Sequence, residues 1–314
     1  MRLVLVAVLV CLLAGCGGGS DGREGSPASQ ESARLPDWVK GALAAKPGPD
    51  VAVTMGSSDF AVGRNRVVFL VVRGNGSLVQ APTATVEFAS SDGQPQRTEA
   101  TLEPLGAHEH GGEEVEPHDH LDVTDVYAAR IQAPRAGRYW FVVTPAGERI
   151  QAVGTLDVAD RTVTPPIGAP APASDNPTLA GAPARAITTA RPPDTELLRH
   201  SIADSLRDHV PFVAVFATPA FCQSRVCGPT VEVVEKVAHE FAGDGVRFIH
   251  VEIYADNDPQ NGFNRWVREW DLPTEPWIFL VDGKGTIRGK FEGAVSVDEL
   301  AHAVEEELLP PSAG

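Results

Sequence analysis

Residues 212–229 read FVAVFATPAFCQSRVCGP. The apolar run 212–217 predicts a buried strand, and Gly228-Pro229 indicates the start of a helix, because proline is tolerated in a first helical turn. In a regular helix, residues five positions apart lie about 140° around the axis and about 7.5 Å along it, whereas a disulfide needs Cα atoms closer than about 7 Å. We therefore expect Cys227 near the helix cap and Cys222 in the preceding loop, with Arg225 between them to stabilise a thiolate.

Apolar spacing on both sides of this stretch predicts a mixed α/β domain over residues 195–314. The expected elements, in chain order, are a helix at 198–206, the strand at 212–217, a helix at 231–241, a strand at 246–253, a helix at 263–270, strands at 277–281 and 286–291, and a helix at 297–308. Ser296 and Glu299 form a capping box before the last helix. This order contains a parallel βαβ unit with an expected right-handed crossover, followed by an antiparallel hairpin.

The order of elements and two motifs resemble the thioredoxin fold. The segment 216–222 resembles the strand and loop that deliver the first cysteine of a thioredoxin, and 273–283, PTEPWIFLVDG, resembles the family's cis-proline strand and hairpin. The similarity points to the membrane-anchored branch, the cytochrome-maturation thioredoxins and the Sco-type copper chaperones. It implies that Cys222 attacks, that Cys227 resolves, and that a cis Pro276 presents backbone to the partner chain.

The sequence departs from this family in two ways. A redox thioredoxin has C-x-x-C, whereas the spacing here is C-x4-C. The family's buried acid on the strand before the cysteines is also missing, because residues 213–215 are all apolar. Glu252 and Glu275 are the candidates to replace that acid, and the alternative is that either is simply a solvated or capping carboxylate.

Three interpretations of the cysteine pair stay open. The first is a thiol–disulfide oxidoreductase that acts on a protein thiol or disulfide and requires no cofactor. The second is a Sco-like protein that handles copper or zinc, although residues 271–276 lack the histidine of that family. The third is a structural disulfide on a scaffold that binds something else, so the sequence leaves open whether the protein is an enzyme.

The N-terminal residues resemble a bacterial lipoprotein signal. A short apolar run at 3–13 follows Arg2 and ends in Leu13-Ala14-Gly15-Cys16, which resembles a lipobox. The run is too short to span a bilayer. The resemblance implies removal of residues 1–15, lipid attachment to Cys16, and location at the extracytoplasmic face of the cell membrane, where disulfides persist. An ordinary secretory signal is the alternative.

The rest of the chain predicts a second domain. With 314 residues, the chain is long enough for two domains. Residues 16–47 are expected to form a flexible tether, 48–160 an all-β sandwich that resembles immunoglobulin-like modules, and 161–194 a Pro/Ala-rich linker. The formal net charge of −16 argues against a nucleic-acid partner, because few cations are left to neutralise phosphates.

A histidine-rich stretch interrupts the predicted β domain. It contains His108, His110, His118 and His120 among several acids. In an extended chain, residues two apart point the same way, so each His-x-His presents two imidazoles on one face. Such a set suits Zn²⁺ or Cu²⁺. The alternative is an acidic loop in which the histidines are merely polar.

Overall fold

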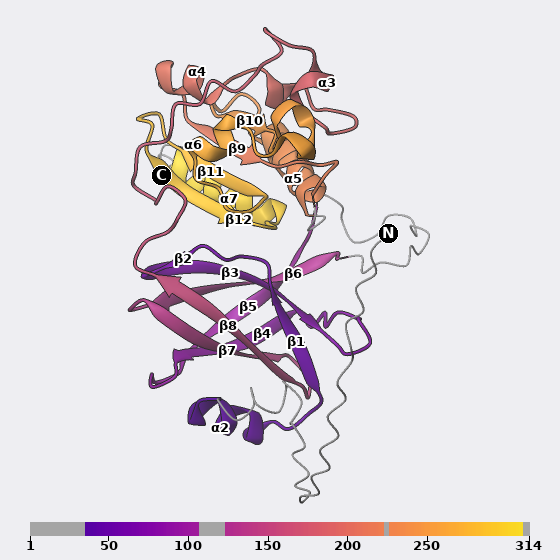
Figure 1. Cartoon of the computed structure of the whole chain (residues 1–314), viewed down its shortest axis with the longest axis vertical. Coiled ribbons are helices and arrows are strands. Elements are labelled where there is room, and N and C mark those ends of the chain that lie inside the picture. The colour runs from indigo at the N-terminus through magenta and orange to yellow at the C-terminus, as the bar shows by residue number, and fades with distance from the viewer. Residues whose placement is uncertain (1–34, 107–122, 223–225, 310–314) are drawn as a thin grey trace, which may run out of the picture. The chain divides into compact units, whose positions relative to one another are not determined.

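The computed structural model describes residues 35–106, 123–222 and 226–309 (Figure 1). From Pro36 onward the chain forms one compact unit. Its first element is the helix α2 (Asp37–Ala45), so the last part of the segment expected to be a flexible tether is helical. Val39 of α2 is fully buried, and the indole N–H of Trp38 donates to the carbonyl of Ser90 at 3.3 Å. The burial of Val39 and this hydrogen bond hold α2 in place. The helix is too short for its apolar residues to show a clear helical period in the sequence.

Eight strands form one sheet in the first part of this unit. They are β1 (Asp50–Met55), β2 (Phe60–Ala61), β3 (Gly63–Val72), β4 (Thr83–Ser90), β5 (Gln96–Pro104), β6 (Asp125–Ala133), β7 (Gly137–Pro145) and β8 (Gln151–Ala159). The order is β1-β3-β6-β5-β4-β7-β8-β2, and β1 also pairs with β8, so the sheet closes on itself. The prediction of an all-β region is confirmed.

The core of the β region is built from alternate residues of these strands. Along β6 the inward positions are buried and the outward positions toward its end are exposed, as period-two side-chain alternation requires. At its centre, Phe69 stacks on Tyr127 with ring centroids 5.4 Å apart and meets the ring of Phe141 edge-on at 5.1 Å. The first contact joins the neighbouring strands β3 and β6, and the second joins β3 to the non-adjacent strand β7 across the closed sheet.

The second part of the unit contains a four-stranded mixed sheet in the order β10-β9-β11-β12. β9 (Phe212–Phe216) is parallel to β10 (Arg247–Val251) and antiparallel to β11 (Trp277–Val281), which pairs antiparallel with β12 (Ile287–Glu292). The helices are α3 (Ala184–Ile187), α4 (Ile202–Arg207), α5 (Cys227–Glu240), α6 (Arg265–Glu269) and α7 (Val297–Leu308), with short 3-10 turns at Glu196–Leu198, Ala255–Asn257 and Pro259–Asn261. The predicted mixture of helices and strands is confirmed.

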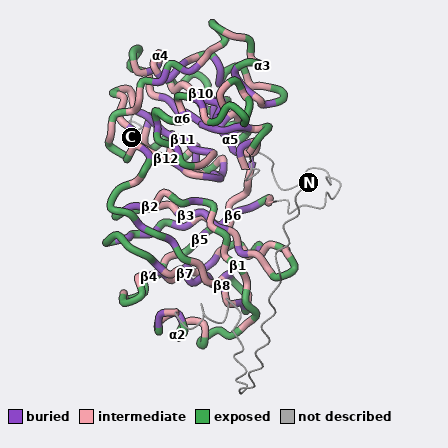
Figure 2. The backbone as a smooth tube through the Cα atoms, viewed as in Figure 1, coloured by how far each residue is buried: buried purple, intermediate pink, exposed green. Residues whose placement is uncertain are grey.

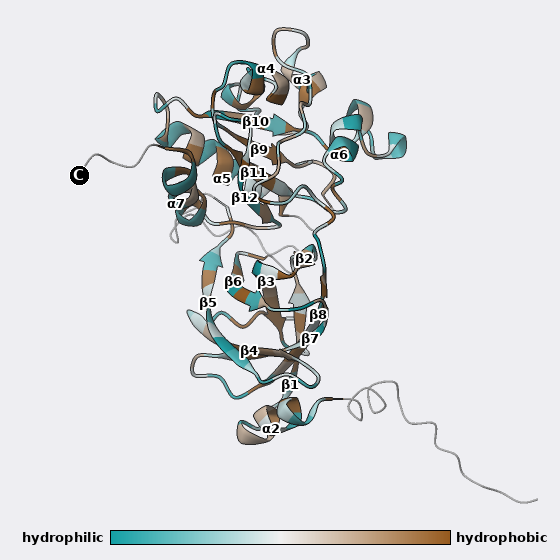
Figure 3. Ribbon diagram, turned by 90° about the vertical axis from the view of Figure 1, so that its left-hand side faces the viewer, coloured by the Kyte–Doolittle hydropathy of each residue, from teal (hydrophilic) through white to brown (hydrophobic). Residues whose placement is uncertain are grey.

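Helices cover both faces of the central strand β9. Val213 and Val215 belong to a core cluster shared with α5 and α7, whereas Phe212, Ala214 and Phe216 pack in a second cluster with α4 and α6. All five residues of β9 are fully buried (Figure 2). The hydropathy colouring is correspondingly brown on the central strands and largely teal along α7 (Figure 3). A strand buried on both faces explains the uninterrupted apolar run that the sequence shows.

The Pro-rich segment after β8 is held by backbone hydrogen bonds to the α/β region. The N–H of Ala171 donates to the carbonyl of Gly285, and the N–H of Ile287 donates to the carbonyl of Ala169, each at 2.9 Å. Farther along, the N–H of Leu179 donates to the carbonyl of Leu198 at 2.9 Å. Within the described ranges, no helix combines the length and the apolar character that crossing a bilayer requires.

Candidate functional site

Cys222 and Cys227 form a disulfide at the start of α5, with their Cα atoms 5.9 Å apart. Cys227 is the first residue of the helix, and Cys222 lies in the loop before it. This is the placement that the C-x4-C spacing requires. Cys227 is completely buried, whereas Cys222 is partly exposed. An incoming group therefore meets the sulfur of Cys222 first.

The first turn of α5 directs one backbone N–H to the pair. The N–H of Cys227 donates to Sγ of Cys222 at 3.3 Å. Pro229 has no backbone N–H. Because the N–H groups of a first helical turn have no partner within the helix, the proline there costs the helix little stability. The positive end of the helix dipole also lies here, and it stabilises negative charge on sulfur.

Glu275 brings a carboxylate to the two sulfurs. One of its carboxylate oxygens and the two Sγ atoms all lie within 4.8 Å of one another. Burial, and then the charge of Glu252, raise the pKa of the Glu275 carboxyl. The peptide bond from Glu275 to Pro276 is cis, as the resemblance implies. The Cys222–Cys227 pair and Glu275, which belong to segments far apart in the sequence, thus meet at one place, and the cis bond to Pro276 directly follows Glu275.

A threonine of the Pro-rich segment connects Glu252 to the cysteine loop. Glu252 is buried, and its Oε1 accepts hydrogen bonds from the N–H of Thr189 at 2.6 Å and from its hydroxyl at 2.5 Å. The same hydroxyl oxygen accepts from the N–H of Ala220 at 3.1 Å. The sequence analysis did not single out Thr189, because no motif distinguishes it within a Pro/Ala-rich stretch.

His250 lies next to this connection and is fully satisfied. Its Nδ1 is 3.2 Å from the hydroxyl of Thr188, and its Nε2 is 3.0 Å from the carbonyl oxygen of Ala217. Both contacts are buried, so His250 supports the loop that leads to Cys222 and leaves no nitrogen for a ligand.

An aromatic group borders the exposed sulfur. Phe221 is 41% exposed, and its ring meets that of Tyr254 edge-on at 6.4 Å. Tyr254 in turn contacts Phe263, with centroids 5.8 Å apart. Burial, and then the charge of Glu275, raise the pKa of Tyr254. By contrast, Trp270 and Trp277 are buried in the core.

Other predicted site residues lie outside the described part of the chain. These are Cys16, Arg225, His108, His110, His118 and His120. The last described residue before the histidine stretch, Gly106, faces the first turn of α5. A Cβ placed on it would lie 3.5 Å from Cβ of Pro229.

No family model and no curated protein matches the chain. Among solved structures, the chain is similar to a thioredoxin-family thiol:disulfide interchange protein from Chlorobium tepidum TLS, with 14% identity and a TM-score of 0.31 over 46% of this chain and 98% of that chain. It is also similar to the Lin-41 filamin domain, with 11% identity and a TM-score of 0.21 over 36% of this chain and 94% of that chain.

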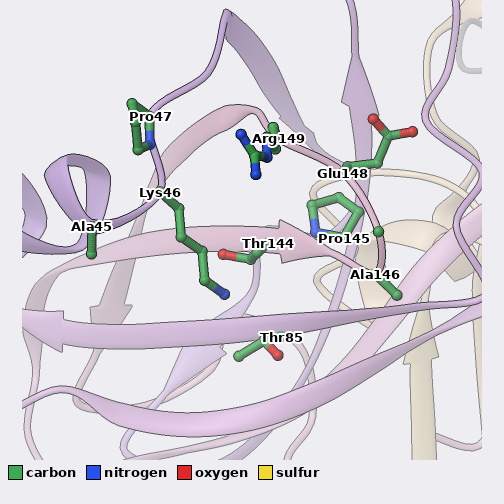
Figure 4. Close-up of a pocket in the computed structure, with 10 residues that line it drawn as sticks. Ala45, Lys46, Pro47, Thr85, Thr144, Pro145, Ala146, Glu148 and Arg149 are labelled. Carbon is green, nitrogen blue, oxygen red and sulfur yellow. The ribbon is translucent and has the colours of Figure 1, made fainter.

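A separate hollow of about 530 Å³ lies in the β region (Figure 4). Its walls are the end of α2, the turn between β7 and β8, and Thr85 of β4. The side chain of Lys46 extends toward Thr144, whereas Glu148 points away and pairs with Arg73 at 2.7 Å. None of the residues of the cysteine site lines this hollow.

Proposed function

We propose that the protein is a thioredoxin-like thiol–disulfide exchange protein that acts on a protein partner through Cys222 and Cys227. The observation that carries this proposal is a disulfide between one partly exposed and one buried cysteine, at a helix start, with a cis proline next to the Glu275 that lies by the sulfurs. The parallel β9–β10 pair followed by the antiparallel β11–β12 pair supports a thioredoxin fold for this region. We assign the β region to an immunoglobulin-like module on the basis of its antiparallel strand content.

The exchange proceeds in two balanced steps. A thiolate of the partner attacks Sγ of Cys222, the bond between the two cysteines breaks, and Cys227 leaves as a thiolate at the helix start. A second thiol of the partner then loses its proton and attacks the partner sulfur that is bonded to Cys222. This attack releases Cys222. The partner has lost two electrons and two protons, and the pair has become a dithiol. The reverse sequence reduces a partner disulfide.

Trapping of the mixed disulfide tests this proposal. Cys227→Ser removes the resolving sulfur, so a covalent complex with a partner should accumulate through Cys222 and disappear on reduction. Cys222→Ser is the matched control, because the remaining sulfur of the pair, that of Cys227, is buried and should trap much less. The absence of any trapped species, together with a reduction potential below about −300 mV, would instead identify a structural disulfide.

The exposed aromatic side chains support a protein as the partner. Phe221 lies directly before Cys222 and remains 41% exposed, although its ring contacts Tyr254. A polypeptide that approaches Cys222 would cover this ring, and burial of an aromatic side chain contributes strongly to binding. Phe221→Ala should therefore weaken partner trapping while small-molecule thiols still reduce the pair at the parental rate.

We also propose that Cys16 carries a lipid and holds the protein at the extracytoplasmic face of the membrane. The supporting features are the short apolar run and the Leu-Ala-Gly-Cys sequence that ends it. Cys16→Ala should leave an unprocessed or released chain in cell fractionation. A variant that is still processed and still sediments with membranes would show that the anchor lies elsewhere.

A second candidate function is metal handling. When the pair is reduced, Cys222, Cys227 and Glu275 offer two sulfurs and an oxygen within 4.8 Å of one another. Two thiolates with a carboxylate suit Zn²⁺ better than Cu⁺, which prefers soft ligands alone. The histidine stretch that begins after Gly106 is a further candidate set for Zn²⁺ or Cu²⁺.

Titration of the reduced full chain with Zn²⁺, and of the disulfide form with Cu²⁺ because Cu²⁺ oxidises free thiols, separates these two sets. Replacing both Cys222 and Cys227 with Ser removes the first, and replacing His108, His110, His118 and His120 with Ala removes the second. Loss of binding in one variant assigns the metal to that set. A dissociation constant weaker than about 100 μM for the parent protein would contradict metal handling.

A further inference from the structure

The loop that joins β1 to β2 in the β region contacts strand β12 of the α/β region. This loop, residues 56–59, directs three donors at Glu292, the last residue of β12. Oε2 of Glu292 accepts from the N–H of Ser58 at 2.7 Å and from the N–H of Asp59 at 2.9 Å, and Oε1 accepts from the hydroxyl of Ser58 at 2.7 Å. Hydrogen bonds to an ionised group are about twice as strong as neutral ones. The β region therefore holds Glu292 by both carboxylate oxygens.

Glu292 connects this contact to the residues around Pro276. Its Oε1 also accepts from the hydroxyl of Thr274 at 2.8 Å, and the Thr274 hydroxyl accepts in turn from the indole N–H of Trp277 at 3.0 Å. Residues 274–277, which we call the cis-proline segment, begin with Thr274 and end with Trp277. One hydroxyl thus ties both ends of the cis-proline segment to the carboxylate that the β region holds.

A second contact between the same two parts involves only backbone. The N–H of Gly293 donates to the carbonyl of Pro276 at 2.9 Å. Gly293 has a φ of +75°, and a Cβ placed on it would lie 2.5 Å from the carbonyl oxygen of Gly56, so only glycine fits here. The loop of the β region therefore lies against the residue that holds the Pro276 carbonyl.

Buried polar groups fix this loop on β12. The Asp59 carboxylate accepts from the N–H of Val163 at 2.7 Å and from the hydroxyl of Thr164 at 2.6 Å. Lys290 of β12 donates to the same hydroxyl at 2.7 Å and lies 3.5 Å from the Asp59 carboxylate. The Lys290 and Asp59 side chains are 13% and 4% exposed. Because separated buried charges are costly, the loop cannot shift on β12 without a large loss of stability.

We propose that the β region holds the cis-proline segment in the conformation that receives a partner polypeptide. This proposal rests on the proposed exchange function. Because Glu275 of the segment lies within 4.8 Å of both sulfurs, a polypeptide that brings a thiol to Cys222 arrives beside this segment. A segment fixed in one conformation binds such a chain without first being ordered, whereas a loose segment is competent for only a fraction of the time. Ser58, Glu292 and Thr274 are thus positioning residues, which act through the segment.

Two thiols of matched chemistry test this role on the oxidised full chain. N-acetylcysteine amide offers the thiol alone, and a blocked hexapeptide with one central cysteine offers the same thiol within a polypeptide. Alkylation and mass spectrometry measure how fast each thiol opens the disulfide, and the parent protein should react faster with the peptide. Thr274→Val removes the hydroxyl between Glu292 and Trp277. It should slow the peptide about tenfold, the factor that one hydrogen bond to a charged group supplies, and leave the rate with N-acetylcysteine amide within about twofold.

Three further variants separate positioning from a merely structural contact. Ser58→Ala removes only the hydroxyl on the β-region side and should slow the peptide about threefold, because Glu292 keeps its two backbone donors. Thr274→Ser keeps the hydroxyl and should restore the parental rate with the peptide. Ser77→Ala is the matched control, because its hydroxyl bonds to Asn75 within a turn of the β region. It should change neither rate.

The outcomes that would overturn the inference are distinct from those that would overturn exchange. If Thr274→Val and Ser58→Ala slow both thiols equally, or slow neither, the contact serves only the fold. If the parent protein reacts no faster with the peptide than with N-acetylcysteine amide, the segment does not receive a polypeptide. In both cases trapping by Cys227→Ser would still support exchange. A disulfide that neither thiol opens in the parent protein would contradict both proposals.

Discussion

Glu235 on α5 carries a pH dependence that lies outside the cysteine site. Burial, and then the charges of Asp194 and Glu232, raise the pKa of its carboxyl from 4.5 to about 7, against a smaller opposing effect of His239. Between pH 4.5 and about pH 7, the Glu235 carboxyl of the folded protein keeps a proton that the same group has lost in the unfolded chain. The stability contributed by this proton is fully present below pH 4.5 and is lost as the pH rises through 7.

Glu235→Gln should therefore stabilise the protein only at the higher pH. We expect the free energy of unfolding to rise by about 1 kcal/mol near pH 8, a figure discounted because the group is partly exposed. No gain is expected near pH 4, where the carboxyl is protonated in both states. Urea unfolding at both pH values checks this, with Glu240→Gln as the exposed control. An equal gain at both values would exclude the electrostatic explanation.

Thr189 shows how one hydroxyl connects two parts of the site. It donates to the buried carboxylate of Glu252 and accepts from the N–H of Ala220, two residues before Cys222. Thr189→Val keeps the shape of the side chain but removes the hydroxyl from both the Glu252 carboxylate and the Ala220 N–H. This loss should lower the free energy of unfolding by about 1–3 kcal/mol. Because Glu252 acts on Glu275, the reduction potential of the pair should shift as well.

Thr189→Ser is the matched control, since it keeps the hydroxyl. It should retain most of the stability and the parental potential. The reduction potential can be measured by equilibrium with glutathione buffers. An unchanged potential in Thr189→Val, despite lower stability, would show that this hydroxyl supports only the fold.

At the scale of elements, the start of α7 shows a capping box that is only half formed. The hydroxyl oxygen of Ser296 accepts from the N–H of Glu299 at 3.2 Å, as predicted. The carboxylate of Glu299, however, binds Arg66 of β3 instead of the cap residue. An arginine supplies a stronger, charge-assisted partner than a backbone N–H.

Ser296→Ala should cost about 1 kcal/mol of unfolding free energy, the usual value for loss of an N-cap. Ser296→Asp should retain most of the stability, because its carboxylate also accepts from the helix N–H groups. Thermal or urea unfolding of both variants measures the difference. If Ser296→Ala proves neutral, the contacts of Glu299 rather than the cap hold the first turn of α7.

At the scale of the whole compact unit, a buried ion pair joins the β region to the α/β region. Nη2 of Arg66 lies 2.6 Å from the carboxylate of Glu299 and 2.8 Å from the carbonyl oxygen of Ala294. The side chains are 8% and 15% exposed, respectively. Nη1 of Arg66 is also buried without a partner among the described residues, so the pair is heavily desolvated.

Glu299→Met should destabilise the protein by about 3–5 kcal/mol, because it leaves the Arg66 charge buried and unpaired. Arg66→Met should cost less, since Arg130 still reaches Glu299 at 3.1 Å. The double Met variant should recover much of the loss, as well-packed apolar residues often match a buried pair. A double-mutant cycle measures this coupling. If the loss of unfolding free energy in the double variant equals the sum of the losses in the two single variants, the two side chains are not coupled and this prediction is wrong.

The sequence by itself determined the local features of the site. The apolar run 212–217 indicated a strand buried on both faces, and the C-x4-C spacing placed Cys227 at the helix start and Cys222 before it. These features follow from covalent geometry and from residues that are neighbours in the chain. The composition also indicated the change from an all-β region to a mixed region, because strand and helix periods differ along the chain itself.

Only the tertiary structure decided which distant residues meet. The position of Glu275 within 4.8 Å of both sulfurs, the hydrogen bonds from Thr189 to Glu252, and the pairing of Arg66 with Glu299 join segments that no local period relates. α2 was missed for the same reason, since it is held by contacts with the β region, such as the hydrogen bond from Trp38 to Ser90. Side-chain identity sets what each group can do, but the packing of the sheets and helices sets which groups are close enough to do it together.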